Sequence, residues 1–293
     1  DVTSEIEKFA GENMPQDPYP TQLAEDSPDI ILAEQGIYLD GVNGDDGRTG
    51  LTPGTAVKTF EKAKEKLIEA LKENPDFNPV IIICGMVTVD NAANWSLADV
   101  TVPEGSPELK RETLRVKRYS RVNDTALVTV TAAGSLTADG ILWDGAADEM
   151  ISEQGKYSGG EAIILVNNGA LTLQNCTMLD NESYNGSSNH TGGGALTASG
   201  GTVNLTNTEI LNTQSSRGAL YFRGNVQATL DGCTITGNER PSSSTPGQTW
   251  ANGGGISAEN GAAVTVKDSV IEGNTTSATH GGHGIAALNA TVT

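Results

Sequence analysis

The chain has 293 residues, of which 37 are acidic and 18 are basic, so its formal net charge is −19 at neutral pH. A protein this acidic repels nucleic acid and anionic membrane surfaces, because both carry negative charge. No apolar run in the sequence is long enough to span a bilayer. We therefore expect neither a nucleic-acid partner nor insertion into a membrane.

The first part of the chain predicts a lead-in followed by a helix. Residues 1–35 are acidic and contain four prolines, which is typical of a linker. Between about 56 and 74 the apolar residues recur at helical spacing and end before an Asn–Pro pair, so this stretch predicts an amphipathic helix that covers the first edge of a sheet. Apolar runs at 80–89, 114–116 and 126–130 predict the first strands.

From Gly134 to its last residue, the chain repeats one short pattern of a strand, a polar corner and a second strand. The copies are GSLTADGILWDG from Gly134, GALTLQNCTMLDN from Gly169, GTVNLTNTEILN from Gly201, VQATLDGCTITGN from Val226 and AAVTVKDSVIEGN from Ala262. A Gly-rich segment such as GGGALTAS or GGGISAEN precedes most copies. Self-similarity of this kind is typical of a solenoid.

The repeats alternate apolar and polar residues, which predicts strands with one buried face. The apolar positions form columns across the copies; they are Ala138, Leu173, Leu205, Leu230 and Val266, then Trp143, Met178, Ile210, Ile235 and Ile271, and in the lead-ins Ile164, Leu196, Leu220, Ile256 and Ile285. Successive copies run in one direction, so their strands are parallel and the crossovers right-handed. We predict an all-β fold, a right-handed parallel β-helix (β-solenoid) with an N-terminal capping α-helix. It forms a single domain over 36–293, with its turns at about 80–293.

Asn181, Asn238 and Asn274 recur three residues after the second apolar column. Asparagine tolerates a left-handed backbone and hydrogen-bonds neighbouring backbone groups, so we expect a stacked asparagine ladder at a tight corner.

The C-terminal residues 290–293 align with the start of another repeat strand. A bare strand edge invites aggregation. We therefore expect that this chain is a fragment of a longer protein with further domains of the same chain; the alternative is that a partner covers this end.

The stretch YLDGVNGDDGRTGLTPGTAVKTFEKA, which begins at Tyr38, resembles the N-terminal cap of pectate-lyase-like right-handed β-helix proteins. The matching residues are Asn43, Gly44, Asp46, Gly50, Lys58, Thr59 and Phe60. With the repeats, the resemblance covers 36–293 and implies a bacterial protein that is secreted or lies at the cell surface. Such proteins include polysaccharide lyases, glycoside hydrolases, epimerases and non-catalytic surface proteins, so the fold alone does not fix the activity.

Three residues are candidates for catalysis. Gly282–His283–Gly284 resembles the Gly-His-Gly motif of polygalacturonase-type hydrolases, but the paired carboxylates that glycoside hydrolysis needs are missing from corresponding turns. A glycine-rich corner with an incidental histidine is the simpler interpretation. Arg217 and Arg223 are the close basic pair of the repeats and could serve a lyase that acts on acidic sugars.

The corners between strands differ in length, and the one at 211–217 is short between two longer ones. Stacked on one flank, these corners would form a saddle for a glycan, because sugar rings stack on aromatic side chains while their hydroxyls find polar partners. The candidate carbohydrate-binding residues are Tyr221 and Arg223 on the floor and Tyr184, His190 and Trp250 on the walls. The alternative is that Tyr184 and Trp250 only anchor their own loops.

The segment DGVNGDDG offers oxygen ligands at Asp40, Asn43, Asp45 and Asp46 and could hold Ca²⁺. The spacing of an EF-hand is not met, and a tight turn explains the same residues more simply. We expect that no cofactor is required.

The sequence thus favours an extracellular or cell-surface, adhesin-like β-helix module that binds a polysaccharide or glycan without catalysis. One alternative is a polysaccharide lyase or glycoside hydrolase that acts in a groove on the flank of the helix. A second alternative is a structural stalk.

Overall fold

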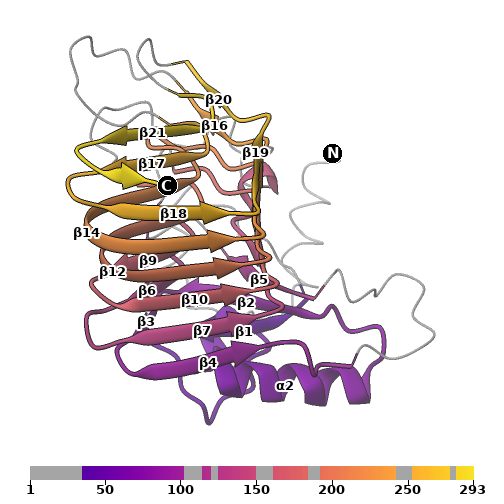
Figure 1. Ribbon diagram of the computed structural model, residues 1–293. Coiled ribbons are helices and arrows are strands. Elements are labelled where there is room, and N and C mark those ends of the chain that lie inside the picture. The colour runs from indigo at the N-terminus through magenta and orange to yellow at the C-terminus, as the bar shows by residue number, and fades with distance from the viewer. Residues whose placement is uncertain are drawn as a thin grey trace, which may run out of the picture.

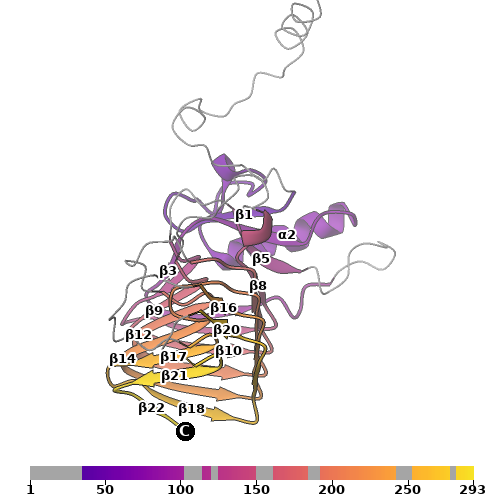
Figure 2. The same cartoon turned by 90° about the horizontal axis from the view of Figure 1, so that it is seen from above.

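The computed structural model describes residues 35–101, 114–119, 125–149, 161–183, 192–241, 253–277 and 282–293. In this part of the chain, parallel strands stack from the helix α2 at one end to the strand β22 at the other (Figures 1 and 2). Three ladders of strands, here called A, B and C, form the sides of the stack. The predicted right-handed parallel β-helix is confirmed, with three strands in a typical turn rather than the minimum of two.

Ladder A is the eight-stranded sheet of the described chain. It runs through β1 (Ile37–Asp40), β2 (Val80–Gly85), β5 (Arg115–Arg118), β8 (Leu142–Asp144), β11 (Thr177–Leu179), β13 (Glu209–Leu211), β15 (Thr234–Thr236) and β19 (Val270–Glu272). Its pairs are parallel, and from β2 onward they are in register, so that Trp143 lies beside Met178 and Met178 beside Ile210.

Ladders B and C share two long strands, β12 (Leu196–Thr206) and β14 (Leu220–Asp231), whose first halves belong to B and second halves to C. The other strands of ladder B are β3 (Val87–Val89), β6 (Val128–Val130), β9 (Ile164–Asn167), β17 (Ile256–Glu259) and β21 (Ile285–Leu288). Ladder C adds β4 (Ala92–Ser96), β7 (Ser135–Asp139), β10 (Ala170–Gln174), β18 (Ala263–Lys267) and β22 (Thr291–Val292).

A short fourth stack follows ladder A. The strand β16 (Glu239–Arg240) pairs with β20 (Thr275–Thr276), and isolated bridges connect Glu182 to Gln214 and Gln214 to Glu239. This stack continues the four coils that contain these residues beyond the asparagine corner.

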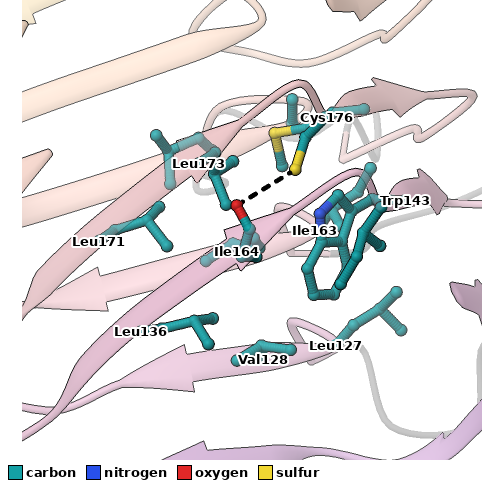
Figure 3. Close-up of a cluster of buried hydrophobic side chains, with 14 of the residues drawn as sticks. Leu127, Val128, Leu136, Trp143, Ile163, Ile164, Leu171, Leu173 and Cys176 are labelled. Carbon is teal, nitrogen blue, oxygen red and sulfur yellow. Dashed lines mark hydrogen bonds between the residues drawn. The ribbon is translucent and has the colours of Figure 1, made fainter. Parts of the chain in front are cut away.

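The interior of the solenoid is filled by the apolar columns that the repeats predict. Leu173 pairs with Ala138 on one side and with Leu205 on the other, and all three are fully buried. Figure 3 shows Leu127, Leu136, Trp143 and other residues of this core between the strands. In the last coil Ile285 is 37% exposed, because no further coil of the described chain lies over it.

The helix α2 (Phe60–Glu73) covers the N-terminal end of the stack (Figure 1). It begins at Phe60 rather than near residue 56, since residues 53–55 form the short 3₁₀ helix η2 (Pro53–Thr55). Its apolar side buries Phe60, and the Phe60 ring stacks on that of Trp95 with centroids 4.5 Å apart. The helix thereby continues the interior column into the cap. Among the described residues, no helix has the length and apolarity needed to cross a membrane.

The predicted asparagine ladder is present, but its residues do not adopt the left-handed conformation. Instead, positive φ belongs to the residue before each of them: Asp180, Gly237 and Gly273. The Asn238 side chain is buried; its Oδ1 accepts hydrogen bonds from the backbone N–H and the hydroxyl of Thr213, both at 2.9 Å, and its Nδ2 donates to the carbonyl of Ile210 at 3.0 Å. Asparagine therefore satisfies buried backbone groups between adjacent coils.

We expect that Asn238→Ala lowers the free energy of unfolding by about 2–3 kcal/mol, because the Thr213 N–H and the Ile210 carbonyl lose buried partners. Urea unfolding followed by circular dichroism measures the change. Asn204→Ala is the control, since Asn204 is an exposed strand residue whose substitution is expected to cost about 0.5 kcal/mol or less. Equal losses in the two variants would contradict a structural role for the ladder.

Candidate functional site

Two of the predicted site residues meet on the outer side of ladder B. The Tyr221 hydroxyl donates a hydrogen bond to Glu259 Oε2 at 2.9 Å, and the Arg217 guanidinium lies 3.8 Å from Glu259 Oε1. The Arg217 guanidinium is also 5.7 Å from the centroid of the Tyr221 ring. All three side chains are buried. We call Arg217, Tyr221 and Glu259 the ladder B cluster.

The Gly-rich segments that precede the strands of ladder B fix the position of this cluster. In GGGALT the N–H of Gly193 donates to the Thr197 hydroxyl at 2.8 Å, and in GGGIS the N–H of Gly253 donates to the Ser257 hydroxyl at 2.9 Å. A Cβ at Gly253 would lie within 1.8 Å of the Ile256 carbonyl oxygen, so only glycine fits there. Each lead-in is thus fixed to the strand that it precedes, and Tyr221 lies between Thr197 and Ser257 in the ladder.

Burial raises the pKa of Tyr221 to about 12, and the neighbouring Glu259 charge and its hydrogen bond add to the shift. Tyr221 therefore stays protonated and acts as a donor, not as a base. Its exposed fraction of 2% also contradicts the predicted role as an open floor of a saddle. The reason is that strand alternation places Tyr221 outside the apolar interior but does not determine whether other parts of the chain cover it.

The other predicted site residues of this region do not form a catalytic arrangement with the ladder B cluster. Arg223 is exposed and donates from Nε to the Ser199 hydroxyl at 2.7 Å. His283 is exposed, and its carbonyl accepts a hydrogen bond from the N–H of Gly255 at 3.2 Å, so its backbone continues the stack of lead-ins. The predicted wall residues Tyr184, His190 and Trp250 lie outside the described residues.

A second group of ionisable residues lies on the outer side of ladder A. Arg115 pairs with Asp144 at 2.9 Å, and the buried Lys117 pairs with Glu149 at 2.5 Å. Asp144 Oδ1 also accepts the N–H of Ala146 at 2.8 Å, and burial raises the pKa of Asp144. These groups link β5 to β8 and to the segment that follows β8.

Asp180 lies at the corner that follows β11 (Thr177–Leu179), and its carboxyl group is partly buried. Burial raises the pKa of Asp180 from its ordinary value of 3.8 to about 7, and the charge of Asp148 adds to the shift. The Asp180 carboxylate accepts the N–H of Asp148 at 3.1 and 3.2 Å. At the equivalent corner of the next coil the chain has Asn212, also at positive φ.

We expect that Asp180→Asn stabilises the protein above neutral pH. A raised folded pKa means that the contribution of protonated Asp180 is complete below pH 3.8 and is lost as the pH rises through about 7. Asparagine keeps an acceptor for the Asp148 N–H, tolerates the positive φ and carries no charge. Thermal unfolding should give a gain of about 1–2 kcal/mol at pH 8, after discounting for partial exposure, and almost none at pH 4.

The reference for this measurement is Asp139→Asn, which removes a carboxylate from the last residue of β7 on ladder C. A pH profile of Asp180→Asn that runs parallel to the wild-type profile would show that Asp180 does not titrate in this range.

The acidic segment of the cap uses three of its four predicted calcium ligands, Asp40, Asp45 and Asp46, as acceptors for backbone N–H groups. Asp40 Oδ1 accepts the N–H groups of Val42 and Asn43, and Asp45 Oδ1 accepts that of Gly47, each at 2.8 Å. Asp46 accepts the N–H of Lys58 at 2.8 Å and both the N–H and the hydroxyl of Thr59 at 2.9 Å.

Thr59 in turn caps α2, because its hydroxyl accepts the N–H of Lys62. Burial opposes the ionisation of Asp46, but its hydrogen bonds outweigh this effect and hold the pKa of Asp46 below its ordinary value. In the described ranges, no three His, Cys, Asp or Glu side chains lie together in a group that could hold a metal ion. The segment therefore orders the start of the helix.

We expect that Asp46→Ala lowers the free energy of unfolding by about 1–2 kcal/mol, because it removes the acceptor for the N–H groups of Lys58 and Thr59 and for the hydroxyl of Thr59, the residue that caps α2. Chemical unfolding measures the loss, and Asp45→Ala, which removes one local hydrogen bond, should cost less. Stabilisation of the wild type by Ca²⁺ that disappears in Asp46→Ala would instead support a metal site.

Ladder C differs from the other two ladders because its outer face is open along its whole described length. The outward residues of its seven strands are all exposed or half-buried. They form a first column of Ala92, Ser135, Ala170, Thr202, Gln227, Ala263 and Thr291, a middle column of Asn94, Thr137, Thr172, Asn204, Thr229, Thr265 and Thr293, and a third column of Ser96, Asp139, Gln174, Thr206, Asp231 and Lys267. We call this surface the ladder C face.

The middle column is the most regular part of the ladder C face. It contains only threonine and asparagine, and its residues are direct neighbours in the ladder. Thr265 and Thr293 are 3.4 Å apart between their hydroxyl oxygens. Within the described residues, the side chains of Thr137, Thr172, Asn204 and Thr229 form no hydrogen bond with the protein, so their polar groups face solvent.

Sequence reasoning missed Glu259 and the ladder C face. Glu259 lies 38 residues from Tyr221, and only the register of β14 with β17 brings them together. The ladder C face has a signal, which is the threonine or asparagine at the central polar position of successive repeats. That signal carries no ionisable or aromatic residue and therefore matches no catalytic motif.

The fold and these surfaces define a right-handed parallel β-solenoid with two outer faces that bury polar clusters and a third that stays open. A family model described as "Right handed beta helix region" matches residues 123–292, which is more than half of the chain. The chain belongs to this family. No curated protein and no solved structure matches it.

Proposed function

We propose that this chain is a non-catalytic module of an extracellular or cell-surface protein and that it binds complex carbohydrate through one flank of its β-helix. The observation that carries the proposal is the open ladder C face, with its aligned hydroxyl and amide groups. Hydroxyls both donate and accept hydrogen bonds, and amides offer one group of each kind, so this face suits the hydroxyl groups of sugars.

The proposal places the contact on ladder C instead of ladder B. On ladder B, Tyr221 is buried and hydrogen-bonded to Glu259, and Arg223 is the exposed member of the predicted set. On ladder C, the side chains of the middle column are exposed or half-buried, and those of Thr137, Thr172, Asn204 and Thr229 form no hydrogen bond within the described residues. A ligand can reach these groups without the rearrangement of a buried cluster.

We propose a non-catalytic role because the ionisable side chains near the predicted site are buried or paired with other side chains. A glycoside hydrolase needs two carboxyl groups at a defined separation on either side of the scissile bond. In the described residues, Glu259 is 1% exposed and is engaged by Tyr221 and Arg217, while Asp144 is paired with Arg115. The raised pKa of Tyr221 also makes it a poor base for a lyase reaction.

A glycan array probed with the intact chain tests the proposal, together with assays for new reducing ends and for the ultraviolet absorbance of unsaturated uronates. We expect retention on glycans without either product. Asn204→Arg places a bulky charge at the centre of the ladder C face and should reduce retention at least tenfold. Thr88→Arg adds the same charge to an exposed position of β3 on ladder B and is the matched control.

Each other outcome contradicts a defined part of the proposal. Product formation would show an enzyme, and a complete lack of retention would favour a structural stalk. A loss of retention with Arg223→Ala but not with Asn204→Arg would return the binding site to ladder B.

A further inference from the structure

We infer that the ligand of the ladder C face is a neutral, unbranched glycan that lies parallel to the axis of the stack. The inference rests on the proposed function and names the class of glycan and its direction. Three properties of the face support it: its charge, its translational repeat and its area.

The ladder C face carries little charge although the chain as a whole has a net charge of −19. The first and middle columns contain no ionisable residue, and the charged residues of the third column are Asp139, Asp231 and Lys267. A polyanion such as a uronate polymer would find no cluster of basic side chains here and would be repelled by the rest of the protein. A neutral polymer meets no such cost.

The middle column presents a similar side chain at each step of the stack. Adjacent parallel strands are about 4.8 Å apart, so the seven strands extend over about 29 Å. A polymer that lies along this direction repeats similar contacts at successive coils. A polymer that runs along a single strand, perpendicular to the axis, would meet only three outward residues before it left the face. The alignment of columns therefore favours an extended chain parallel to the axis.

The area of the face argues against a protein partner. Three outward residues along a strand span about 13 Å, which with the length of the ladder gives roughly 400 Å². A stable protein–protein interface needs about 800 Å² from each partner, so a second copy of this chain would have too little contact. A single extended glycan chain needs only a narrow strip of this kind.

The same face predicts how the affinity depends on glycan length. Its outward residues include no aromatic side chain in the described strands, so binding depends on hydrogen bonds that contribute about 1 kcal/mol each. Short oligosaccharides should therefore bind weakly. The affinity should rise with length until the oligomer spans the ladder.

Native gel electrophoresis in the presence of polysaccharide tests the inference with a pair of polymers that share one backbone. We expect that hydroxyethyl cellulose or another neutral linear glycan, such as mannan, retards the intact chain, and that carboxymethyl cellulose and polygalacturonate do not. The retardation should persist at high salt, because it does not depend on charge. A series of neutral oligosaccharides used as competitors measures the dependence on length.

The double variant Thr172→Val and Thr229→Val removes two hydroxyls of the middle column while retaining shape and strand propensity. It should weaken binding of the neutral polymer roughly tenfold or more. The control is Thr88→Val, the same change at an exposed strand position of ladder B, with unaltered binding expected. Unfolding curves of all variants show whether each remains folded.

The outcomes separate this inference from the proposed function. Preferential binding of the carboxylated polymers would overturn the neutral class but leave a glycan-binding module. Binding of neutral polymers that is indifferent to Thr172 and Thr229 would remove the ladder C face as the site. Tight binding of a disaccharide with no gain from longer oligomers would contradict the axial direction. A lack of binding to every polymer would overturn both the inference and the proposed function.

Discussion

The in-register, parallel hydrogen bonding of successive coils is the constraint on which the rest of this structure depends. Each strand pairs with its equivalent in the coil before and the coil after, so that a residue such as Leu205 lies directly between Leu173 and Leu230. A side chain therefore meets the same position of the repeat on both sides. Apolar residues gain from such contacts, whereas a column of like charges would repel itself.

This constraint explains why asparagine and threonine recur, and it also separates their two uses. Amide and hydroxyl groups stack without charge repulsion, so both are compatible with an aligned column. In the corner, Asn238 is buried and its side chain satisfies Thr213 and Ile210. On ladder C, Asn204 and Thr229 are accessible, and their polar groups are not used within the described chain. The asparagines of the corner therefore stabilise the fold, whereas the polar side chains of ladder C are available to a ligand.

The repeats predict the columns of the core and the register because they depend on a period of two and on aligned copies. The same reasoning predicts the cap helix, although Pro53 shifts its start by forming a separate 3₁₀ turn before Phe60. It could not predict the burial of Tyr221, because alternation tells on which side of the strand a residue lies but not what covers that side. The partnership of Tyr221 with Glu259 joins adjacent coils across 38 residues of sequence and leaves no local pattern.

The N-terminal coils show why the repeat pattern is lost while the architecture continues. The strands β1 and β2 extend ladder A beyond the region that the family model matches. In β2, Ile81 faces the main core, whereas Val80 and Ile82 belong to a second apolar cluster on the outer side with Tyr38. A strand that is buried on both faces needs apolar residues at every position, so VIIICG replaces the alternation seen in later coils. When the outer face of a strand is covered, apolar residues occupy both faces and the alternation of apolar and polar residues disappears. In β10 and β18, by contrast, apolar residues alternate with threonine because the outer face of these strands remains in contact with water.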